Sequence, residues 1–477
     1  MPQLPTENIL CRTDSYKVTH WRQYPPGVQK VYSYFESRGG RFHDVAFFGL
    51  QYYLKRYLEG VVVTQEKIEQ ADELFRLHFA DKEGYLFNRQ AWEDMVNYYH
   101  GRLPVTIKAP LEGSVIPGHN VMMTIENTDP RFYWLPNYLE TLLVQTWYGC
   151  TVATQSREMK KLILRYLRST GDPAQVGFKL HDFGFRGVSS VETAGIGGAA
   201  HLINFLGTDT FEGIMVARDY YSEPMVGFSI PAAEHSTITS WGRENELKAM
   251  KNMLTQFSSG LVAVVSDSFN IYEACHDIWG DKLHDLVMER DGTLVIRPDS
   301  GDPVAVICEI LSILGEKFGY TVNEKGYKVL DPHVRLIQGD GIDFDMLNSI
   351  LKAMKRTEWS ADNIAFGSGG GLLQKLNRDT LKFAFKCSSI TINGEERPVF
   401  KSPITDKGKK SKQGRLKLIC VEGIRGLSYK TVSSVDEPEL YRDSQDEMVE
   451  VFRNGELIVD QSFADIRKRA EINEREL

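Results

Sequence analysis

Glycine is concentrated in one short stretch of the chain, AFGSGGGLLQKLNRD at residues 365–379. Glycine-rich loops that open a helix commonly bind a phosphate, because their exposed N–H groups and the helix dipole both favour an anion. A P-loop carries a lysine and a hydroxyl residue directly after its last glycine, whereas Gly371 is followed by Leu372 and Leu373. The stretch therefore predicts either a phosphate loop of another class or a plain tight turn.

Charged side chains follow a series of short apolar runs in the middle of the chain. Parallel α/β folds collect their functional groups where strands end, and buried charges there are unfavourable unless paired or bound to a ligand. The groups at these ends are His181, Asp182, Arg186, Asp209, Glu234, His235, Asp267, Arg297, Asp299 and Asp340. Arginine binds phosphate through two hydrogen bonds, and a carboxylate can accept both hydroxyls of a ribose diol. The set therefore predicts a phosphorylated-sugar site, with Mg²⁺ bound mainly through substrate phosphates.

The spacing of the apolar runs predicts the fold that positions these groups. The runs with their polar ends are VGFKLHDFGFRG (176–187), HLINFLGTDT (201–210), MVGFSIPAAEHS (225–236), LVAVVSDS (261–268), TLVIRPDSGD (293–302), VRLIQGDG (334–341) and NIAFGSGGG (363–371). Spacings of roughly 24–40 residues are typical of βα units. We therefore predict an irregular parallel α/β barrel, with an open doubly wound sheet as the alternative.

The two ends of the chain have a different pattern. TQEKIEQADELFRLHFA (64–80) predicts a helix, PVTIKAP (104–110) a strand, and SFADIRKRAEINEREL at the carboxyl end a terminal helix. We predict a β-rich α+β domain built from both termini, residues 1–150 together with 388–477, around a barrel domain of residues 151–387.

Composition narrows the possible partners and surroundings. The chain has 477 residues, a net charge of -8 and six scattered cysteines without a CxxC pair. The negative charge disfavours nucleic-acid binding, and the cysteine pattern favours reduced thiols in the cytoplasm over disulfides or a zinc site. Because no run approaches 18 apolar residues, we expect no membrane partner.

Two short motifs match known functional patterns only in part. Asp182-Phe183-Gly184 matches a kinase metal motif, but the HRD loop and glycine-rich hairpin of a kinase are missing from the sequence. GIGGAA (195–200) approximates a dinucleotide fingerprint, yet the preceding VSSVETA is a poor buried strand. Close packing of a helix is the favoured interpretation of these glycines.

Long strings along the chain resemble the nicotinamide phosphoribosyltransferase family of type II phosphoribosyltransferases. The strings are TDSYKVTHWRQYPP (13–26), VYSYFESRG (31–39), FFGLQYYL (47–54), NTDPRFYWLPNYLETLLVQTWY (127–148) and KLHDFGFRGVSS (179–190), then GTDT, PAAEHSTIT, SDS, IRPDSG, IQGDG and NIAFGSGGGLLQKL further on. The resemblance implies a barrel with a second β-rich domain, and a homodimer with active sites at the subunit interface. It implies transfer of phosphoribosyl from phosphoribosyl pyrophosphate to nicotinamide, with Mg²⁺ and with coupled ATP hydrolysis. A nicotinate phosphoribosyltransferase and a non-catalytic binding protein on the same scaffold are the alternatives.

The resemblance also implies roles for individual residues. Phe183 and Tyr16 of the partner subunit would stack on the two faces of the pyridine. ATP would phosphorylate His235, with Asp267 orienting the imidazole. The implied catalytic residues are His235, Asp267, Arg297 and Asp299. The implied substrate-binding residues are Tyr16, Phe183, Arg186, Asp209, Ser229, Gly339, Asp340, Gly369, Gly370 and Arg378. The implied pyrophosphate and ATP residues are Arg38, Arg186, His235, Arg297, Lys386, Lys401 and Lys409.

Asp209 in GTDT has two interpretations. In a Thr-Asp-Thr turn it would cap the following helix. With the resemblance, its carboxylate would accept a hydrogen bond from the carboxamide of nicotinamide and repel the carboxylate of nicotinate. We therefore expect a strong preference for nicotinamide.

Overall fold

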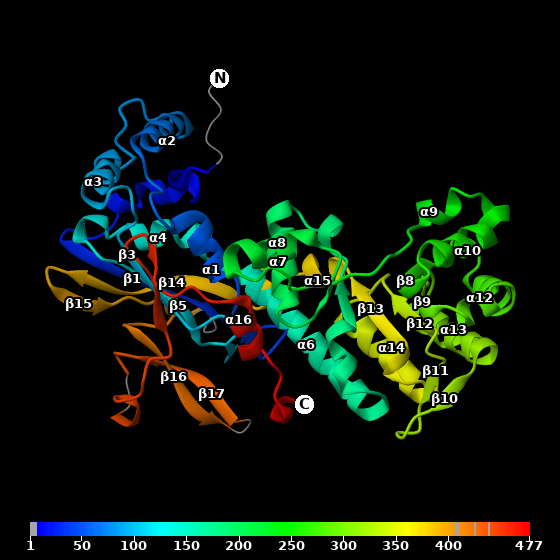
Figure 1. Cartoon of the computed structure of the whole chain (residues 1–477). Coiled ribbons are helices and arrows are strands. Elements are labelled where there is room, and N and C mark those ends of the chain that lie inside the picture. Colours follow the sequence, from blue (N-terminus) through cyan, green and yellow to red (C-terminus); the bar gives the residue numbers. More distant parts are fainter. Residues whose placement is uncertain (1–6, 406–409, 424–425, 437–438) are drawn as a thin grey trace. The chain divides into compact units, whose positions relative to one another are not determined.

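A parallel β-sheet occupies the middle of the chain in the computed structural model, which describes residues 7–405, 410–423, 426–436 and 439–477 (Figure 1). Its strands lie in the order β7-β6-β13-β12-β9-β8. Their bounds are β6 Leu180–Asp182, β7 Gly207–Thr208, β8 Ser259–Val265, β9 Asp291–Arg297, β12 Val334–Gln338 and β13 Ile364–Ser368. The pairing is in register along each strand, as between β8 and β9, where Leu261 lies opposite Thr293 and Val265 opposite Arg297.

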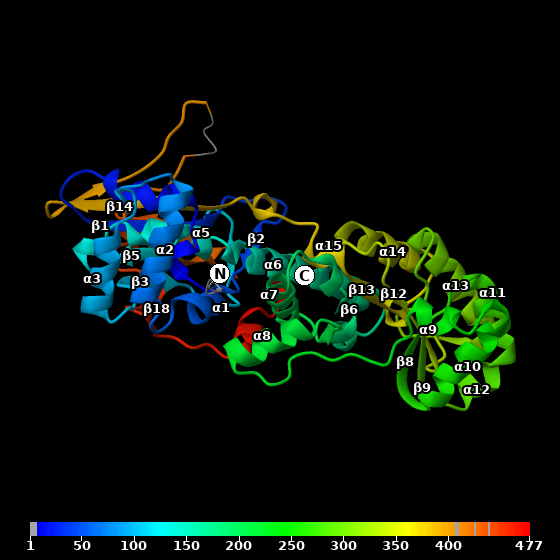
Figure 2. The ribbon, with the colours of Figure 1, turned by 90° about the horizontal axis from the view of Figure 1, so that it is seen from above.

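An extended segment joins the two edges of this sheet. Phe228 forms a parallel bridge with Gly207 of β7, and Ala232 forms one with Ala263 of β8. The N–H of Thr208 donates to Phe228 O at 3.0 Å, and the N–H of Ala263 donates to Pro231 O at 2.9 Å. Figure 2 shows this connection running from α8 toward β8. The segment closes the sheet into an irregular parallel barrel, which confirms the predicted fold and excludes the open doubly wound sheet.

Helices cover the outside of the barrel, with α10 against β8 and α13 against β12 (Figure 1). Several begin at side-chain caps: Asp302 accepts from the N–H of Ala305 at 2.8 Å, and Pro303 follows at the first helical position. The helices are α6 Thr146–Thr170, α7 Val191–Leu202, α8 Phe211–Tyr221, α9 His235–Thr239, α10 Glu246–Gln256, α11 Ile271–Glu273, α12 His284–Met288, α13 Pro303–Phe318, α14 Phe344–Arg356 and α15 Gly370–Leu373. A small hairpin of β10 Tyr320–Val322 and β11 Lys328–Leu330 follows α13.

The glycines of GIGGAA serve helix packing, as predicted. A Cβ on Gly198 of α7 would lie 3.0 Å from the Cα of Gly213 in α8. A Cβ on Gly213 would in turn lie 2.7 Å from the carbonyl carbon of Gly198. The two helices therefore approach at these glycines more closely than side chains would permit.

Apolar side chains, two of them alanines, line the inside of the barrel. Ala263, Val295 and Ile337 form one buried layer, against which Phe183, Ile230 and Ala365 pack. The alanines of β8 and β13 fill less space than the valine, isoleucine and leucine side chains common in barrel interiors. This layer leaves room for the cavity described below.

A second, antiparallel sheet combines strands from the two ends of the chain. Its order is β15-β14-β1-β5-β3-β18-β19, so β1 pairs with β14, and β3 pairs with β18. The strands are β1 Val28–Ser37, β3 Val105–Ala109, β5 Val121–Asn127, β14 Phe383–Ile392, β15 Glu395–Pro398, β18 Val449–Arg453 and β19 Glu456–Leu457. Two further antiparallel pairs are β2 Asp44–Ala46 with β4 Val115–Pro117, and β16 Leu416–Gly423 with β17 Gly426–Ser433. This confirms the β-rich fold built from both termini.

The helices of the terminal segments are α1 Leu50–Tyr53, α2 Gln65–His78, α3 Arg89–Tyr99, α4 Leu135–Tyr138, α5 Glu140–Leu143 and α16 Phe463–Arg469. The helix predicted over 64–80 is confirmed as α2, which is capped by Thr64. The terminal helix is shorter than predicted, because α16 ends at Arg469. Asn473 then accepts from the N–H of Arg475 and begins a separate 3-10 turn.

The chain forms two compact units. One contains Met1–Thr154, Asp219–Glu223 and Leu376–Glu471, and it holds the antiparallel sheet. The other contains Gln155–Arg218, Pro224–Lys375 and Ile472–Leu477, and it holds the barrel. Across the described residues, none of the helices combines the length and apolar character that crossing a bilayer requires.

Candidate active site

A histidine and two aspartates meet at the carboxyl ends of β8 and β9. His235, the first residue of α9, places its Nε2 3.0 Å from Asp267 Oδ1. The other oxygen of Asp267 accepts from the N–H of Asp299 at 3.1 Å and from Ser300 Oγ at 2.5 Å. The Asp267 side chain is 3% exposed and that of His235 45% exposed. The buried carboxylate is therefore fixed on three sides, and it holds an accessible imidazole in one orientation.

Arg297 ends β9 beside this group. Its guanidinium lies 3.4 Å from Asp299 Oδ2, and its Nε is buried without a hydrogen-bond partner among the described residues. A buried guanidinium nitrogen without an acceptor is unfavourable in water-free surroundings. The group is suited to binding an anion that enters the barrel end.

A cavity of about 290 Å³ lies within the barrel. At the carboxyl ends of the strands it is bordered by Phe183, Asp209, Ser229 and Arg297. Further residues along it include His181, Phe178, Phe228, Ile230, Ala263, Val295, Ile337 and Ala365. The middle of the lining is mainly apolar, and further polar groups stand toward the amino ends of the strands, namely Gln175, Lys179, Arg335 and Asp362. An apolar cavity with a few polar groups is typical of a site for a small organic ligand.

Asp209 faces Ser229 across the mouth of this cavity. Ser229 Oγ donates to Asp209 Oδ1 at 2.5 Å, and both residues are exposed. The turn before α8 is made by Thr208, whose Oγ1 accepts from the N–H of Thr210 at 3.0 Å. The side chain of Asp209 lines the cavity. The turn before α8, which the other interpretation expected Asp209 to cap, is supported by the hydroxyl of the neighbouring Thr208.

Phe183 follows β6, and its ring packs on glycines of the neighbouring strands. A Cβ on Gly367 would lie 2.0 Å from Phe183 Cε2, and one on Gly339 would lie 3.4 Å from the same atom. The N–H of Phe183 donates to Ser368 O at 3.0 Å. Gly367 is therefore required by the ring of Phe183, which sequence reasoning had not separated from the phosphate-loop glycines.

The remaining glycines of the loop are not equivalent. A Cβ on Gly371 would lie 2.3 Å from Ile342 O, whereas nothing lies within 4 Å of one on Gly370. The N–H groups of Gly370 and Gly371 donate no hydrogen bond to another of the described residues. The helix that follows ends at Leu373, so Arg378 does not lie on it. Arg378 instead begins a separate 3-10 turn, Arg378–Thr380.

Five of the predicted residues line a second cavity, of about 1010 Å³, in the unit that holds the antiparallel sheet. They are Tyr16, Arg38, Arg378, Lys386 and Lys401. Tyr16 is 56% exposed, and the cavity contains more cations than anions. Burial is the main cause that lowers the pKa of Lys386, and nearby cations lower it further. Such a cavity favours a polyanion such as a phosphate chain.

The other predicted residues lie at the barrel ends or outside the described chain. Arg186 is exposed in the turn Phe185–Gly187, and Asp340 is exposed after β12. Lys409 lies outside the described residues. Burial raises the pKa of Asp182 to about 6, although the N–H of Gly184 donates to its Oδ1 at 2.7 Å. Burial also lowers the pKa of His181, which favours a neutral imidazole at the cavity wall.

Sequence reasoning missed one residue of the His235 group. Ser300 directly follows Asp299 in the string IRPDSG, and its hydroxyl donates to Asp267. The signal that could have found it was its position directly after Asp299, a predicted site residue. The hydrogen bond itself joins residues 33 positions apart and has no local pattern.

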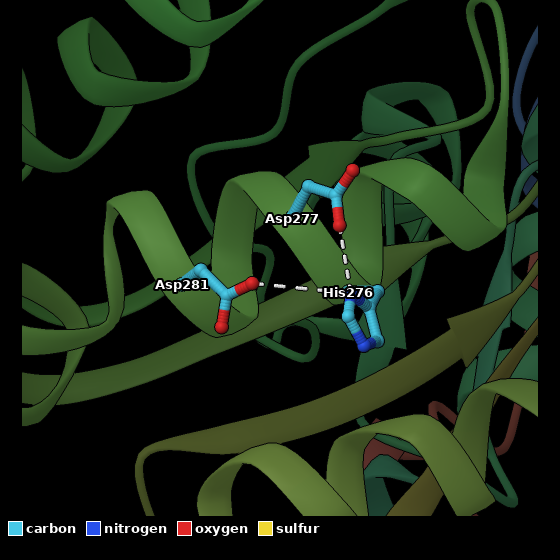
Figure 3. A group of neighbouring side chains, drawn as sticks. All are labelled: His276, Asp277 and Asp281. Carbon is cyan, nitrogen blue, oxygen red and sulfur yellow. Dashed lines mark hydrogen bonds and ion pairs between the residues drawn. The ribbon is translucent and has the colours of Figure 1, made fainter.

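A possible metal-binding group lies elsewhere, on the surface (Figure 3). His276 Nδ1 is 2.7 Å from Asp277 Oδ1 and 3.9 Å from Asp281 Oδ2. Asp281 also pairs with Lys317 Nζ at 2.7 Å, and the three side chains of the group are about half exposed. Since the lysine already neutralises one carboxylate, we assign no metal to this group.

The sequence of the chain is similar to those of known proteins. The sequence matches the nicotinate phosphoribosyltransferase (NAPRTase) family over residues 178–456 and the nicotinamide phosphoribosyltransferase N-terminal domain over residues 8–107. It is 49% identical to a nicotinamide phosphoribosyltransferase of Xanthomonas campestris pv. campestris over 98% of each chain. It is 33% identical to a nicotinamide phosphoribosyltransferase of Acinetobacter baylyi over 97% of each chain.

Solved structures share the fold at low sequence identity. A nicotinate-nucleotide pyrophosphorylase from Pyrococcus furiosus superposes with a TM-score of 0.60 at 15% identity, covering 98% of this chain and 96% of that one. Human nicotinic acid phosphoribosyltransferase superposes with a TM-score of 0.57 at 14% identity, covering 96% and 92%. At this identity the likeness is one of fold alone.

Proposed function

The chain belongs to the nicotinate phosphoribosyltransferase family, and we propose that it transfers the phosphoribosyl group of phosphoribosyl pyrophosphate to nicotinamide. The products are nicotinamide mononucleotide and pyrophosphate, in the salvage of NAD. The observation that carries the proposal is the cavity that joins Phe183, Asp209, Ser229 and Arg297 at the carboxyl ends of the barrel strands.

The base is recognised at the mouth of this cavity. The ring of Phe183 provides one flat apolar face for the pyridine. The carboxylate of Asp209, oriented by Ser229, accepts a hydrogen bond from the carboxamide NH₂. A carboxylate in the same place would be repelled, which favours nicotinamide over nicotinate.

The sugar and its phosphates lie toward the glycine loop and the arginines. Asp299 accepts the ribose hydroxyls, Arg297 and Arg186 contact the pyrophosphate, and the N–H groups of Gly369 and Gly370 bind the 5′-phosphate together with Arg378. Gly339 and Asp340 complete this set at the end of β12. The buried Nε of Arg297, which lacks a partner in the described chain, supports an anion beside it.

The reaction needs positioning more than proton transfer. Pyrophosphate leaves C1 of the ribose through an oxocarbenium-like transition state, and the neutral ring nitrogen of nicotinamide attacks C1. Because this nitrogen carries no proton, the protein supplies no general base for the step. Mg²⁺, held mainly by the substrate phosphates, would neutralise charge on the departing pyrophosphate. Arginine and lysine side chains stabilise the same developing charge.

ATP hydrolysis is coupled through His235. If Nε2–H donates to Asp267, Nδ1 carries the lone pair and attacks the γ-phosphorus of ATP. A P–N bond forms, ADP leaves, and water later cleaves the P–N bond to release phosphate. Arg38, Lys386, Lys401 and Lys409 would belong to a polyphosphate site that reaches across the dimer.

The working assembly is a cytoplasmic homodimer with shared active sites. Tyr16 of the partner subunit would cover the second face of the pyridine. The exposure of the Tyr16 ring in the single chain supports this arrangement.

One assay tests the proposed function. Purified protein is given phosphoribosyl pyrophosphate and Mg²⁺ with nicotinamide or nicotinate, with and without ATP, and the mononucleotide products are separated. We expect nicotinamide mononucleotide as the main product, with stimulation by ATP. Preference for nicotinate would assign the other activity of the family, and no product from either pyridine would support a non-catalytic role.

A further inference from the structure

A buried glutamine holds the end of the glycine loop. Gln155 lies in the middle of α6 and is 1% exposed. Its Nε2 donates to Gly371 O at 2.8 Å and to Leu372 O at 3.2 Å. Since both acceptors are carbonyl oxygens, only the amide NH₂ group can face them, which fixes the orientation of the side chain.

The loop needs this support because α15 is a single turn. Within it, the N–H of Leu372 donates to Gly369 O and the N–H of Gln374 donates to Gly370 O, both at 3.0 Å. The last carbonyls of a helix have no partner inside the helix, and those of Gly371 and Leu372 are paired with Gln155. One turn rich in glycine is also a poor helix by itself, because nucleation is unfavourable and glycine has low helix propensity.

The two ends of the loop have different anchors. Ser368 Oγ donates to Ile342 O at 2.6 Å, and Ser368 O accepts from the N–H of Phe183, so the start of the loop is held by the barrel strands. The end of the loop is held by Gln155, which lies 216 positions earlier in the sequence than Gly371. Gln155 therefore controls the part of the loop where the N–H groups of Gly370 and Gly371 lack acceptors.

We propose that Gln155 is a positioning residue for phosphoribosyl pyrophosphate. Gln155 stabilises the one-turn helix α15, so that the loop is already ordered when the 5′-phosphate of the substrate binds. The proposal rests on the proposed function for the identity of the ligand. Gln155 itself does not contact nicotinamide in this proposal; Phe183 and Asp209 do.

The test compares two variants of Gln155 with a neighbour on the same helix. Gln155→Met keeps the length of the side chain and removes both donors, and Gln155→Asn keeps the amide with a shorter reach in case the first variant folds poorly. Ser156→Ala is the matched control, because Ser156 Oγ makes a buried hydrogen bond of 2.9 Å to His201 Nδ1 and does not contact the loop.

Three quantities are measured on each protein. They are the dissociation constant of phosphoribosyl pyrophosphate with Mg²⁺ by calorimetry, the KM of each substrate, and the amide hydrogen exchange of residues 366–376. For Gln155→Met we expect about tenfold weaker binding and a similar rise in the KM of phosphoribosyl pyrophosphate, since one buried and one part-buried carbonyl lose their donor. The KM of nicotinamide should change by less than about twofold, and the loop amides should exchange faster. Gln155→Asn should fall between wild type and Gln155→Met.

Two results would overturn the proposal. One is unchanged binding and unchanged loop exchange in Gln155→Met. The other is an equal rise in both KM values that Ser156→Ala reproduces, which would indicate a general loss of stability. Failure of the proposed function has a different signature: wild type would not bind phosphoribosyl pyrophosphate, while faster loop exchange in Gln155→Met would still identify Gln155 as the anchor of the loop.

Discussion

Replacing Asp209 with asparagine tests how the protein chooses between two pyridines that differ only in a carboxamide or a carboxylate. The carboxylate of Asp209 borders the barrel cavity and accepts from Ser229 Oγ at 2.5 Å. Asparagine has the same shape, keeps an acceptor for the serine hydroxyl, and removes the negative charge. The change therefore isolates charge repulsion from the shape of the site.

The size of the effect follows from Coulomb's law. Two like charges about 4 Å apart repel by about 4 kcal/mol at an effective dielectric near 20, and by about 1 kcal/mol in water. Asp209 is exposed in the single chain, whereas a pyridine stacked on Phe183 would displace water from it. We therefore expect an intermediate value of about 2–3 kcal/mol, which corresponds to roughly a 30- to 150-fold change in the ratio of kcat/KM values.

Competition kinetics measures this ratio directly. Both pyridines are supplied together to wild type, Asp209→Asn and Ser229→Ala, and the two mononucleotides are quantified. Asp209→Asn should shift the ratio toward nicotinate by the amount above, and Ser229→Ala by less, because the charge remains. Asp285→Asn is the control, since it makes the same change of net charge at a side chain that is 95% exposed and outside the cavity lining. A ratio unaltered in Asp209→Asn would refute the role of this carboxylate in substrate choice.

Three further predictions follow from the site and from the carboxyl end of the chain. His235→Ala should abolish ATP hydrolysis and ATP stimulation while slow ATP-independent synthesis remains, as measured by separate phosphate-release and product assays; a normal ATPase would contradict the phosphohistidine. Tyr16→Ala and Arg297→Ala subunits, each inactive alone, should recover part of the activity when co-expressed as mixed dimers, because one composite site carries neither change. Confirmed mixed dimers without activity would place Tyr16 in the site of its own subunit. Glu476→Gln should destabilise the fold at pH 7 by about 1–2 kcal/mol after allowance for solvent screening. Burial raises the pKa of Glu476, but the hydrogen bonds and charge of Arg157, at 2.6 and 2.8 Å, lower it to about 2. A depressed folded-state pKa gives stability that is complete above the unfolded value near 4.5 and is lost as the pH falls toward 2. In thermal unfolding the difference between variant and wild type should therefore shrink below about pH 4.5, and a difference that stays constant with pH would count against the ion pair.

The barrel could be predicted because its strands are buried on both faces. A strand such as β8 is then a continuous apolar run, LVAVV, followed directly by the polar string SDS. Repetition of that pattern predicted most of the strands and the residues at their carboxyl ends, including Asp267 and Asp299. The run at 225–236 forms only isolated bridges, so His235 follows a bridged segment and begins α9 instead of ending a strand. The carboxyl-terminal helix was predicted too long, because its polar residues continue a helical pattern past Arg469 while Asn473 begins a new turn.

Contacts between distant residues have no local signal in the sequence. The hydrogen bond between His235 and Asp267, 32 positions apart, was expected only from the family resemblance, and that between Gln155 and Leu372, 217 positions apart, was not expected. Gln155 lies in α6 between Thr154 and Ser156, which are polar and buried as well, so its type and its neighbours do not distinguish it. Gly367 likewise has no local signal, because the atoms that exclude a side chain there belong to the ring of Phe183, which follows another strand.

The sequence by itself determined which chemical groups are present and at which strand ends they stand, since apolar periodicity and turn residues act over a few positions. Tertiary structure alone decided which of those groups meet. The closing segment through Phe228 and Ala232 brings β7 and β8 around one cavity, and strand register places Asp267 against both His235 and Ser300. The physical reason is that pairing between distant strands depends on the packing of the whole barrel, which no short stretch of the chain encodes.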